Sequence, residues 1–282
     1  MSATDLELKE VRGPAAVSGS PRRFVNLTWL LATTDFKLSY FGSVLGYLWT
    51  LMQPLMFFGV LYFVFAVLLD LNKDVANFPV LLLMNIVLFS FFQSGTGGAI
   101  PSVVVREGVV RKMQFPRLVI PLATVTTAAI NLFFNLVVVL IFMLSYGLAP
   151  RLTWLLLPVI VLALFVLTTG IAMLLSALYV RYRDVSPIWS SISQALYFAS
   201  PVFILINTIL KGHPWVGRYY LFNPIATILQ QARVWMVGGT RSPAHYMGGA
   251  VWLLVPTALV VGVFVLGYRV FSREAPRVAE EL

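Results

Sequence analysis

The stretch Arg106-Glu-Gly-Val-Val-Arg-Lys-Met-Gln-Phe-Pro-Arg117 is the densest basic cluster in the hydrophobic part of this 282-residue chain. Runs without any charged residue, 75–105 and 118–150, flank it on both sides. Each run is longer than the ~20 residues that an α-helix needs to cross the hydrocarbon of a bilayer. The cluster is therefore predicted to be a loop at one membrane face, between two membrane-spanning helices.

The composition excludes an ordinary soluble domain. Only 11% of the residues are charged and the mean hydropathy is +0.88, whereas roughly a quarter of the residues of a soluble domain are charged. Lipid can cover the apolar surface that a core of this size could not bury. The net charge of +9 fits Lys and Arg retained in cytoplasmic membrane loops better than it fits nucleic-acid binding. The chain has no cysteine, which excludes disulfides and cysteine-ligated metals.

The hydropathy pattern predicts an all-α polytopic membrane protein with six transmembrane helices in residues 51–271. Six runs without Asp, Glu, Lys or Arg are each long enough to span a bilayer. An even number of spans places both termini on one side, so residues 1–22 and 272–282 are predicted to be tails on that side. The estimated spans are 52–69, 78–100, 119–147, 153–179, 188–208 and 248–268.

Residues 23–50, ahead of the first span, are predicted to form an amphipathic helix in the membrane interface. Asp35 and Lys37 lie near the middle of this otherwise apolar segment. A helix that lies in the interface fits this pattern better than a span does, and a first transmembrane helix with a charged start is the alternative. The segment also carries aromatic rings that suit headgroup depth, namely Trp29, Phe36, Tyr40, Tyr47 and Trp49.

The distribution of Lys and Arg predicts the orientation. The N-terminal 50 residues, the loops 101–118 and 180–187 and the tail from Arg269 together carry fourteen of these residues, whereas the opposite face carries six. Cytoplasmic loops retain positive charge. Both termini and the loop 101–118 are therefore predicted to be cytoplasmic.

The long outer segment 209–247 contains a helix with clear boundaries. Asn223 can cap its N-terminus, Pro224 suits the first helical position, and Gly238 suits the left-handed residue after the C-terminus. The helix, which includes Trp235, is too short to cross a bilayer. A re-entrant helix between spans five and six is the preferred interpretation, and an ordinary surface helix is the alternative.

The chain lacks the motifs that most energy-converting or catalytic proteins carry. No Gly-x-x-x-x-Gly-Lys-Ser/Thr phosphate loop and no Gly-x-Ser-x-Gly occur, and the two histidines, His213 and His245, lie far apart in the sequence. The predicted span interiors contain no ionisable residue of the kind that ion-coupled carriers use. We therefore predict no enzyme, no metal site and no cofactor on this chain. A partner must supply the energy for any transport against a gradient.

The polar residues of the span interiors are amides and hydroxyls. Hydrogen bonding between helices is the simpler interpretation, and the other is that some of them line a polar route together with aromatic rings that can stack on sugars. The interior polar residues are Asn85, Gln93, Thr124, Thr126, Thr127, Asn131, Asn135, Ser193 and Gln194. The candidates for a channel are Tyr47, Phe57, Phe58, Tyr62, Phe89, Phe92 and Asn131.

Five motifs resemble the membrane-spanning subunits of type-2 ABC exporters of the O-antigen, capsule, teichoic-acid and cell-wall glycan class. They are Asp35-Phe-Lys-Leu-Ser-Tyr-Phe-Gly-Ser-Val-Leu-Gly-Tyr-Leu-Trp-Thr-Leu-Met-Gln-Pro54, Arg111-Lys-Met-Gln-Phe-Pro-Arg-Leu-Val-Ile-Pro121, Tyr179-Val-Arg-Tyr-Arg-Asp-Val185, Ser200-Pro-Val-Phe203 and Asn223-Pro224. The likeness extends over most of residues 24–270. The chain departs from the family pattern at Thr34 and Ser39, where basic residues are usual, and at Glu107-Gly108, where an Asn often stands.

The resemblance implies a homodimer with two cytoplasmic ATPase subunits, which hold ATP and Mg, in the bacterial inner membrane. The substrate it implies is a polyprenyl-diphosphate-linked glycan. The residues that it implies for coupling to the ATPase are Arg106, Arg111, Lys112, Phe115, Pro116 and Arg117 in the coupling loop 101–118. It also marks Asp35, Lys37 and Tyr40 in the interface helix and Arg181, Arg183 and Asp184 in the second inner loop as site residues.

Three alternatives remain at this point. A type-2 ABC exporter of a drug, lipid or other hydrophobic small molecule would share the architecture. A membrane-embedded lipid or glycan transferase would need acidic or metal-binding groups near one membrane face, whereas Asp35, Glu107 and Asp184 are scattered among basic neighbours. A scaffold without transport activity is the third alternative. Co-purification of an ATPase would exclude the last two.

Overall fold

The computed structural model describes residues 20–68, 77–108, 116–202 and 216–274. Every regular element in these ranges is a helix. Five of the helices are long and apolar enough to cross a membrane, which confirms a polytopic helical membrane protein. They are α2 (Leu48–Tyr62) continued by η1 (Phe63–Leu68), α3 (Phe78–Ala99), α6 (Val119–Ser145), η3 (Leu152–Leu156) continued by α7 (Leu157–Arg181), and η4 (Ala250–Leu253) continued by α13 (Leu254–Glu274).

These five helices coincide with the first, second, third, fourth and sixth predicted spans, but the fifth differs. Helix α8 (Val185–Ala199) has only 15 residues. The backbone of Ser200 is extended, as expected for the residue before Pro201, because the proline ring disfavours the helical conformation there. The rest of the predicted span, 203–208, lies outside the described residues, so the structure does not confirm six spans.

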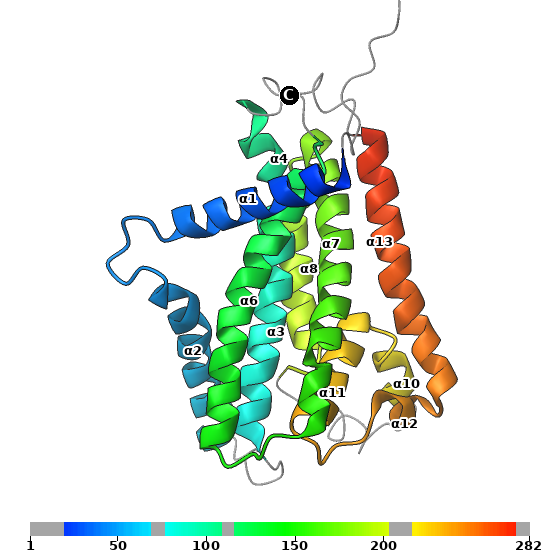
Figure 1. Ribbon diagram of the computed structural model, residues 1–282. Coiled ribbons are helices and arrows are strands. Elements are labelled where there is room, and N and C mark those ends of the chain that lie inside the picture. Colours follow the sequence, from blue (N-terminus) through cyan, green and yellow to red (C-terminus); the bar gives the residue numbers. More distant parts are fainter. Residues whose placement is uncertain (1–19, 69–76, 109–115, 203–215, 275–282) are drawn as a thin grey trace, which may run out of the picture.

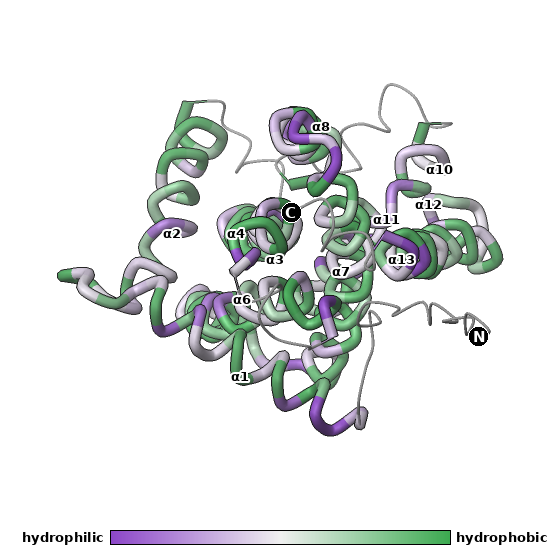
Figure 2. Tube along the Cα trace, turned by 90° about the horizontal axis from the view of Figure 1, so that it is seen from above, coloured by the Kyte–Doolittle hydropathy of each residue, from purple (hydrophilic) through white to green (hydrophobic). Residues whose placement is uncertain are grey.

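Helix α3 forms the centre of the molecule. It packs against α6 and α7, and Figure 2 shows α2, α8 and α13 placed around this central group. Within the span of α3, 83% of the residues are buried, compared with 6% for α2 with η1 and 11% for the span of α13. The peripheral helices therefore present most of their apolar surface outward, to lipid or to other protein.

Two glycines allow α7 and α13 to pack closely. A Cβ atom added to Gly267 would lie 2.1 Å from the carbonyl oxygen of Gly170, and one added to Gly170 would lie 2.7 Å from Cα of Phe264. Small residues at such a crossing let two membrane helices approach to backbone contact. This pair fixes where α13 lies on the bundle.

Helix α1 (Pro21–Ser39) runs across the long helices rather than along them (Figure 1). Thr28 and Ala32 are its buried residues. Phe24, Leu27 and Leu31, which are three or four residues apart on one face, pack against the start of α6. The helix ends at Ser39, and a turn with positive φ at Gly42 and Gly46 precedes α2. The predicted helix over 23–50 is therefore two helical segments with a turn between them.

The two ends of the bundle carry different elements. Helix α4 (Ser102–Val105), the start of α1 and the end of α13 lie at one end, whereas α10 (Val216–Tyr220), α11 (Pro224–Met236) and α12 (Pro243–Met247) lie at the other (Figure 1). The described chain therefore begins and ends on the side of the predicted coupling loop.

Helix α11 has the boundaries that its sequence predicts. The side chain of Asn223 accepts a hydrogen bond from the backbone N–H of Ile225 at 3.0 Å. Pro224 is the first helical residue, and Gly238, with φ of 73°, follows the last turn. The capping chemistry of this helix is confirmed, whereas its depth in a membrane remains a prediction.

Candidate functional site

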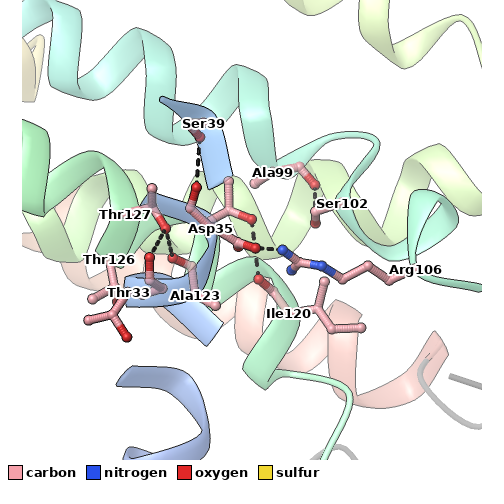
Figure 3. Close-up of polar contacts among 12 residues, drawn as sticks. Thr33, Asp35, Ser39, Ala99, Ser102, Arg106, Ile120, Ala123, Thr126 and Thr127 are labelled. Atoms are coloured by element: carbon pink, nitrogen blue, oxygen red, sulfur yellow. Dashed lines mark hydrogen bonds and ion pairs between the residues drawn. The ribbon is translucent and has the colours of Figure 1, made fainter. Parts of the chain in front are cut away.

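The coupling loop and the transverse helix α1 meet in an ion pair. Arg106 ends the short helix α4, and its Nη2 donates to Oδ2 of Asp35 on α1 (Figure 3). The two side chains are 21% and 26% exposed, respectively. These residues are 71 positions apart in the sequence, so only the crossing of α1 over the bundle brings them together.

The other residues of the predicted coupling loop divide into two groups. Arg111, Lys112 and Phe115 lie outside the described residues. Pro116 and Arg117 are described, and both are buried. Arg117 is only 2% exposed, and burial lowers the pKa of its guanidinium because a charge loses hydration there. In this structure Arg117 supports the base of the loop and does not present its charge at the surface.

The second inner loop presents its charges outward. Arg181, Arg183 and Asp184 are exposed. The guanidinium carbon of Arg183 lies 5.0 Å from the ring centroid of Tyr179, and that of Arg181 lies 5.4 Å from the ring centroid of Tyr182. Rings at these distances attract the cations without neutralising them. This loop therefore offers exposed positive charge at the same end of the bundle as α4.

One cavity lies between α2, α3 and α6, and a second adjoins it between α1, α3, α4 and α6. The larger has a volume of about 890 Å³ and the smaller of about 360 Å³. Ser94, Ala128 and Asn131 line both of them, so the two cavities adjoin, and together they are called the groove. Asp35 and Arg106 lie at the wall of the smaller cavity. The groove thus extends from the ion pair into the region of the apolar spans.

Four of the hydroxyl groups that line this groove donate their hydrogens to backbone carbonyls. Ser94 donates to the carbonyl of Phe91, Ser102 to Ala99, Thr124 to Ile120 and Thr127 to Ala123, at 2.7–3.3 Å. A hydroxyl oxygen that donates in this way still has lone pairs for a second partner. The wall therefore favours a ligand that brings its own donors, such as the hydroxyl groups of a sugar.

Two asparagines on α6, one turn apart, attach the connection between α1 and α2. The hydroxyl of Tyr40 donates to Oδ1 of Asn131 at 3.3 Å, and Nδ2 of Asn135 donates to the carbonyl of Thr50 at 3.1 Å. Asn131 lies where the two cavities join. The Tyr40–Asn131 hydrogen bond therefore crosses the groove at this junction.

The predicted channel aromatics occupy three different environments. Phe57 lines the larger cavity together with Asn131. Tyr47 stacks on Phe36, with ring centroids 5.2 Å apart, and Phe58 packs against Tyr62 and Phe142. Phe89 and Phe92 are fully buried in the core. Neither of these two lines the groove in this structure, because α3 turns them toward α8.

Sequence reasoning missed Ser90 and Ser94 of α3, which line the groove. They are four residues apart, and Gly98 follows after another four. This spacing places small and polar side chains on one face of a helix, which is the signal that could have found them. Of the interior polar residues, Gln93, Thr124, Thr127, Asn131 and Asn135 line the groove.

The opposite end of the bundle contains a buried polar cluster where α8 ends. Arg233 of α11 is 1% exposed and donates to the carbonyl of Pro201. Nδ2 of Asn85 donates to the carbonyls of Pro201 and Val202 at 3.2 and 3.3 Å. The carbonyl of Trp235 accepts from the hydroxyl of Thr153. These contacts satisfy backbone groups at the break after α8 and join α11 to α3 and η3.

In the described part of the chain, no group of three or more His, Cys, Asp or Glu side chains that could hold a metal ion occurs.

Comparison with known proteins gives several relatives over most of the chain. It is 26% identical over 258 residues to an O-antigen export system permease protein, RfbA, of Klebsiella pneumoniae. The aligned region covers 91% of this chain and 95% of that relative. The RfbA permease of Myxococcus xanthus is 30% identical over 179 residues, 64% of this chain and 68% of that protein. The polysialic acid transport protein KpsM of Escherichia coli is 23% identical over 201 residues, covering 67% and 72%.

The ABC-2 type transporter family matches residues 26–237, which include α1, the coupling loop, the groove and α11. The match covers three quarters of the 282 residues. It agrees with the polytopic helical fold and with the five motifs that span the chain. This chain is therefore a member of the ABC-2 type transporter family, a multi-pass membrane subunit of a transporter.

Proposed function

We propose that this chain is the permease subunit of an ATP-driven exporter of a polyprenyl-diphosphate-linked polysaccharide. It works as a homodimer with two ATPase subunits in the bacterial inner membrane, with both termini and the loop 101–118 in the cytoplasm. Relatives named for O-antigen export and polysialic acid transport support this substrate class. The same class follows from the resemblance of the sequence motifs.

The observation that carries the proposal is the groove formed by the two adjoining cavities. Its wall combines hydroxyl and amide oxygens with the ring of Phe57. A glycan presents many hydroxyl donors and apolar ring faces, so both parts of this wall suit it. A wholly apolar cargo would leave the lone pairs of these oxygens without a donor.

The energy for export comes from the partner ATPase. This chain has no phosphate-binding loop for ATP. The ATPase must therefore drive the permease through a conformational change that is transmitted by contact. The loop 106–117 is the receiving element in this proposal. In this proposal Phe115 provides an apolar contact for the ATPase, and the buried Pro116 restricts the chain beside it, since proline limits both its own φ and the residue before it. Arg111 and Lys112 provide charges for the ATPase surface.

The test uses the complex of this chain with its ATPase, reconstituted in lipid vesicles that contain a lipid-linked glycan. The variant combines Phe115→Ala with Arg111→Glu. We expect ATP hydrolysis to persist while glycan export falls about tenfold, because the loop no longer passes the movement of the ATPase to the spans. Arg241→Glu is the matched control, since Arg241 is an exposed arginine at the opposite end of the bundle.

Two results would contradict the proposal. Unchanged export per ATP in the loop variant would remove the coupling role of the loop. Failure of the wild-type complex to move a lipid-linked glycan, with transport of a hydrophobic small molecule instead, would favour the drug or lipid exporter of the same family. Failure to bind any ATPase would exclude an ATP-driven role altogether.

A further inference from the structure

We infer that the Asp35–Arg106 ion pair joins α1 to the coupling loop as one moving unit. In this arrangement Asp35 and Arg106 are positioning residues that carry a movement of the loop to the junction of the two cavities at Asn131. The inference rests on the proposed function, because it assumes that an ATPase moves the loop. It assigns the step between that movement and the groove to named residues.

The first argument concerns how the loop is held on its permease side. Arg106 follows a helix of only four residues, α4, which itself follows Pro101. A segment this short has little rigidity of its own, so side-chain contacts must fix its position. Arg106 forms a charge-assisted hydrogen bond with Asp35, and about three quarters of each side chain is shielded from solvent. Charge-assisted bonds away from water are stronger than exposed ion pairs.

The second argument compares this bond with the contacts between α1 and α6. The hydroxyl of Thr127 donates to the carbonyl of Ala32 on α1 at 3.1 Å, but it can also donate to Ala123 of its own helix at 2.9 Å. It therefore loses little when α1 moves away. The hydrogen bond between Tyr40 and Asn131 is long, at 3.3 Å, and joins two neutral groups. Among the polar contacts, those from α1 to α6 are exchangeable, whereas the one from α1 to the loop is charge-assisted.

The third argument concerns the direction of the movement. The N-terminal half of α1 packs its apolar stripe, including Phe24, Leu27 and Leu31, into the cluster at the start of α6. The C-terminal half carries Asp35, and after it come Gly42 and Gly46 with positive φ. Glycine adopts such backbone conformations without strain. The ring of Phe36 in this half stacks on Tyr47, just ahead of α2, with ring centroids 5.2 Å apart. A swing of the C-terminal half about the packed half therefore carries the start of α2 with it.

The consequence lies at the groove. Asp35 and Ser39 line the smaller cavity, and Tyr40 bonds to Asn131 where the cavities join. A swing of the C-terminal half of α1 lengthens or breaks this hydrogen bond and widens the junction. Figure 3 shows that Arg106 reaches α1 from the side of the coupling loop, so the movement has a direct path from the loop to the groove.

The test begins with charge variants in the purified complex of permease and ATPase, reconstituted with lipid-linked glycan. Asp35→Asn and Arg106→Gln should each lower the export per ATP about tenfold while the rate of ATP hydrolysis stays within about twofold. Exchange of the charges, Asp35→Arg with Arg106→Asp, should restore at least half of the lost coupling. Arg22→Gln, which removes an exposed charge from the same helix, is the matched control.

A cross-link separates a positioning role from a merely structural one. The chain has no cysteine, so Asp35→Cys with Arg106→Cys gives one defined pair of thiols. The assembled complex should be uncoupled before treatment. It should recover coupling when a short thiol-reactive cross-linker joins the two positions, because the covalent bridge replaces the ion pair. A second pair, Tyr40→Cys with Asn131→Cys, should instead block export when it is cross-linked.

The outcomes distinguish the inference from the proposed function. If the wild-type complex exports glycan but the 35–106 cross-link blocks export, the two elements must separate during transport and the inference is wrong. If the charge variants couple like the wild type, the ion pair has no positioning role. If the wild-type complex exports no glycan, the proposed function itself fails, whatever the variants do.

Discussion

Single residues decide where polar contacts form inside this apolar protein. Asn131 and Asn135 attach the turn between α1 and α2 to α6, and Asn85 holds the carbonyls after α8. An amide can donate and accept without carrying a charge, so it can serve in a region where a charged side chain would be costly. The same property lets one amide, Asn131, both hold Tyr40 and face the groove.

The N-terminal cap of α11 allows a prediction at this scale. Replacement of Asn223 by Ala removes the acceptor for the N–H of Ile225 and should lower stability by about 1 kcal/mol. Asn223→Asp keeps an acceptor oxygen and should retain most of that stability. Thermal unfolding of the two variants in detergent measures the difference. Equal unfolding temperatures for Asn223→Ala and the wild type would contradict the capping role.

At the scale of whole helices, close packing between the helices holds the bundle together, and hydrophobicity alone does not. Lipid is as apolar as the spans, so close packing and polar contacts must hold them together. Helix α3 is packed against other helices on nearly every side, and α13 is in backbone contact with α7. Helix α2 has few such contacts, and the groove lies on its inner side.

The crossing of α7 and α13 gives the prediction at the element scale. Gly267→Ala would place Cβ 2.1 Å from the carbonyl oxygen of Gly170, and the overpacking should cost about 1–3 kcal/mol. Gly262→Ala on the same helix is the matched control, because nothing lies within 4 Å of the added atom. Thermal unfolding in detergent should show a lower midpoint for Gly267→Ala alone. A loss of similar size in both variants would mean that the crossing is not the cause.

For the whole molecule, function depends on space that no single helix defines. The groove is bounded by α2, α3 and α6, and the transverse helix α1 reaches its narrower part. Elements at one end of the bundle meet the proposed ATPase, and α11 lies at the other end (Figure 1). The groove therefore adjoins the end of the bundle that carries α4 and extends toward the spans, on the side away from α11.

Filling the groove tests its role at this scale. Ser94 lines both cavities, and Ser94→Trp would put a large ring at their junction. We expect export to fall about tenfold while ATP hydrolysis continues, because the added indole occupies the route and leaves the coupling loop intact. The control is Ser191→Trp, on an exposed position of α8 outside both cavities. Normal export by Ser94→Trp would show that cargo passes elsewhere.

Much of the fold could be predicted from the sequence because its local rules are strong. A long run without charged residues is stable in a bilayer only as a helix with satisfied backbone groups, and five predicted spans are found as helices. The capping residues of α11 act within a few positions of one another, so they too were predictable. For the fifth predicted span, hydropathy alone does not show that helix α8 ends at Ala199, ahead of Pro201.

The sequence by itself determined the helical membrane fold, the five long helices, the boundaries of α11 and the family motifs. Only the tertiary structure decided that Asp35 meets Arg106, that Arg117 is buried, and which residues line the groove. The physical reason is that the spans are apolar on all sides. The hydrophobic pattern of each span therefore does not show which face points inward. The rotation and the neighbours of each helix depend on contacts between residues far apart in the chain.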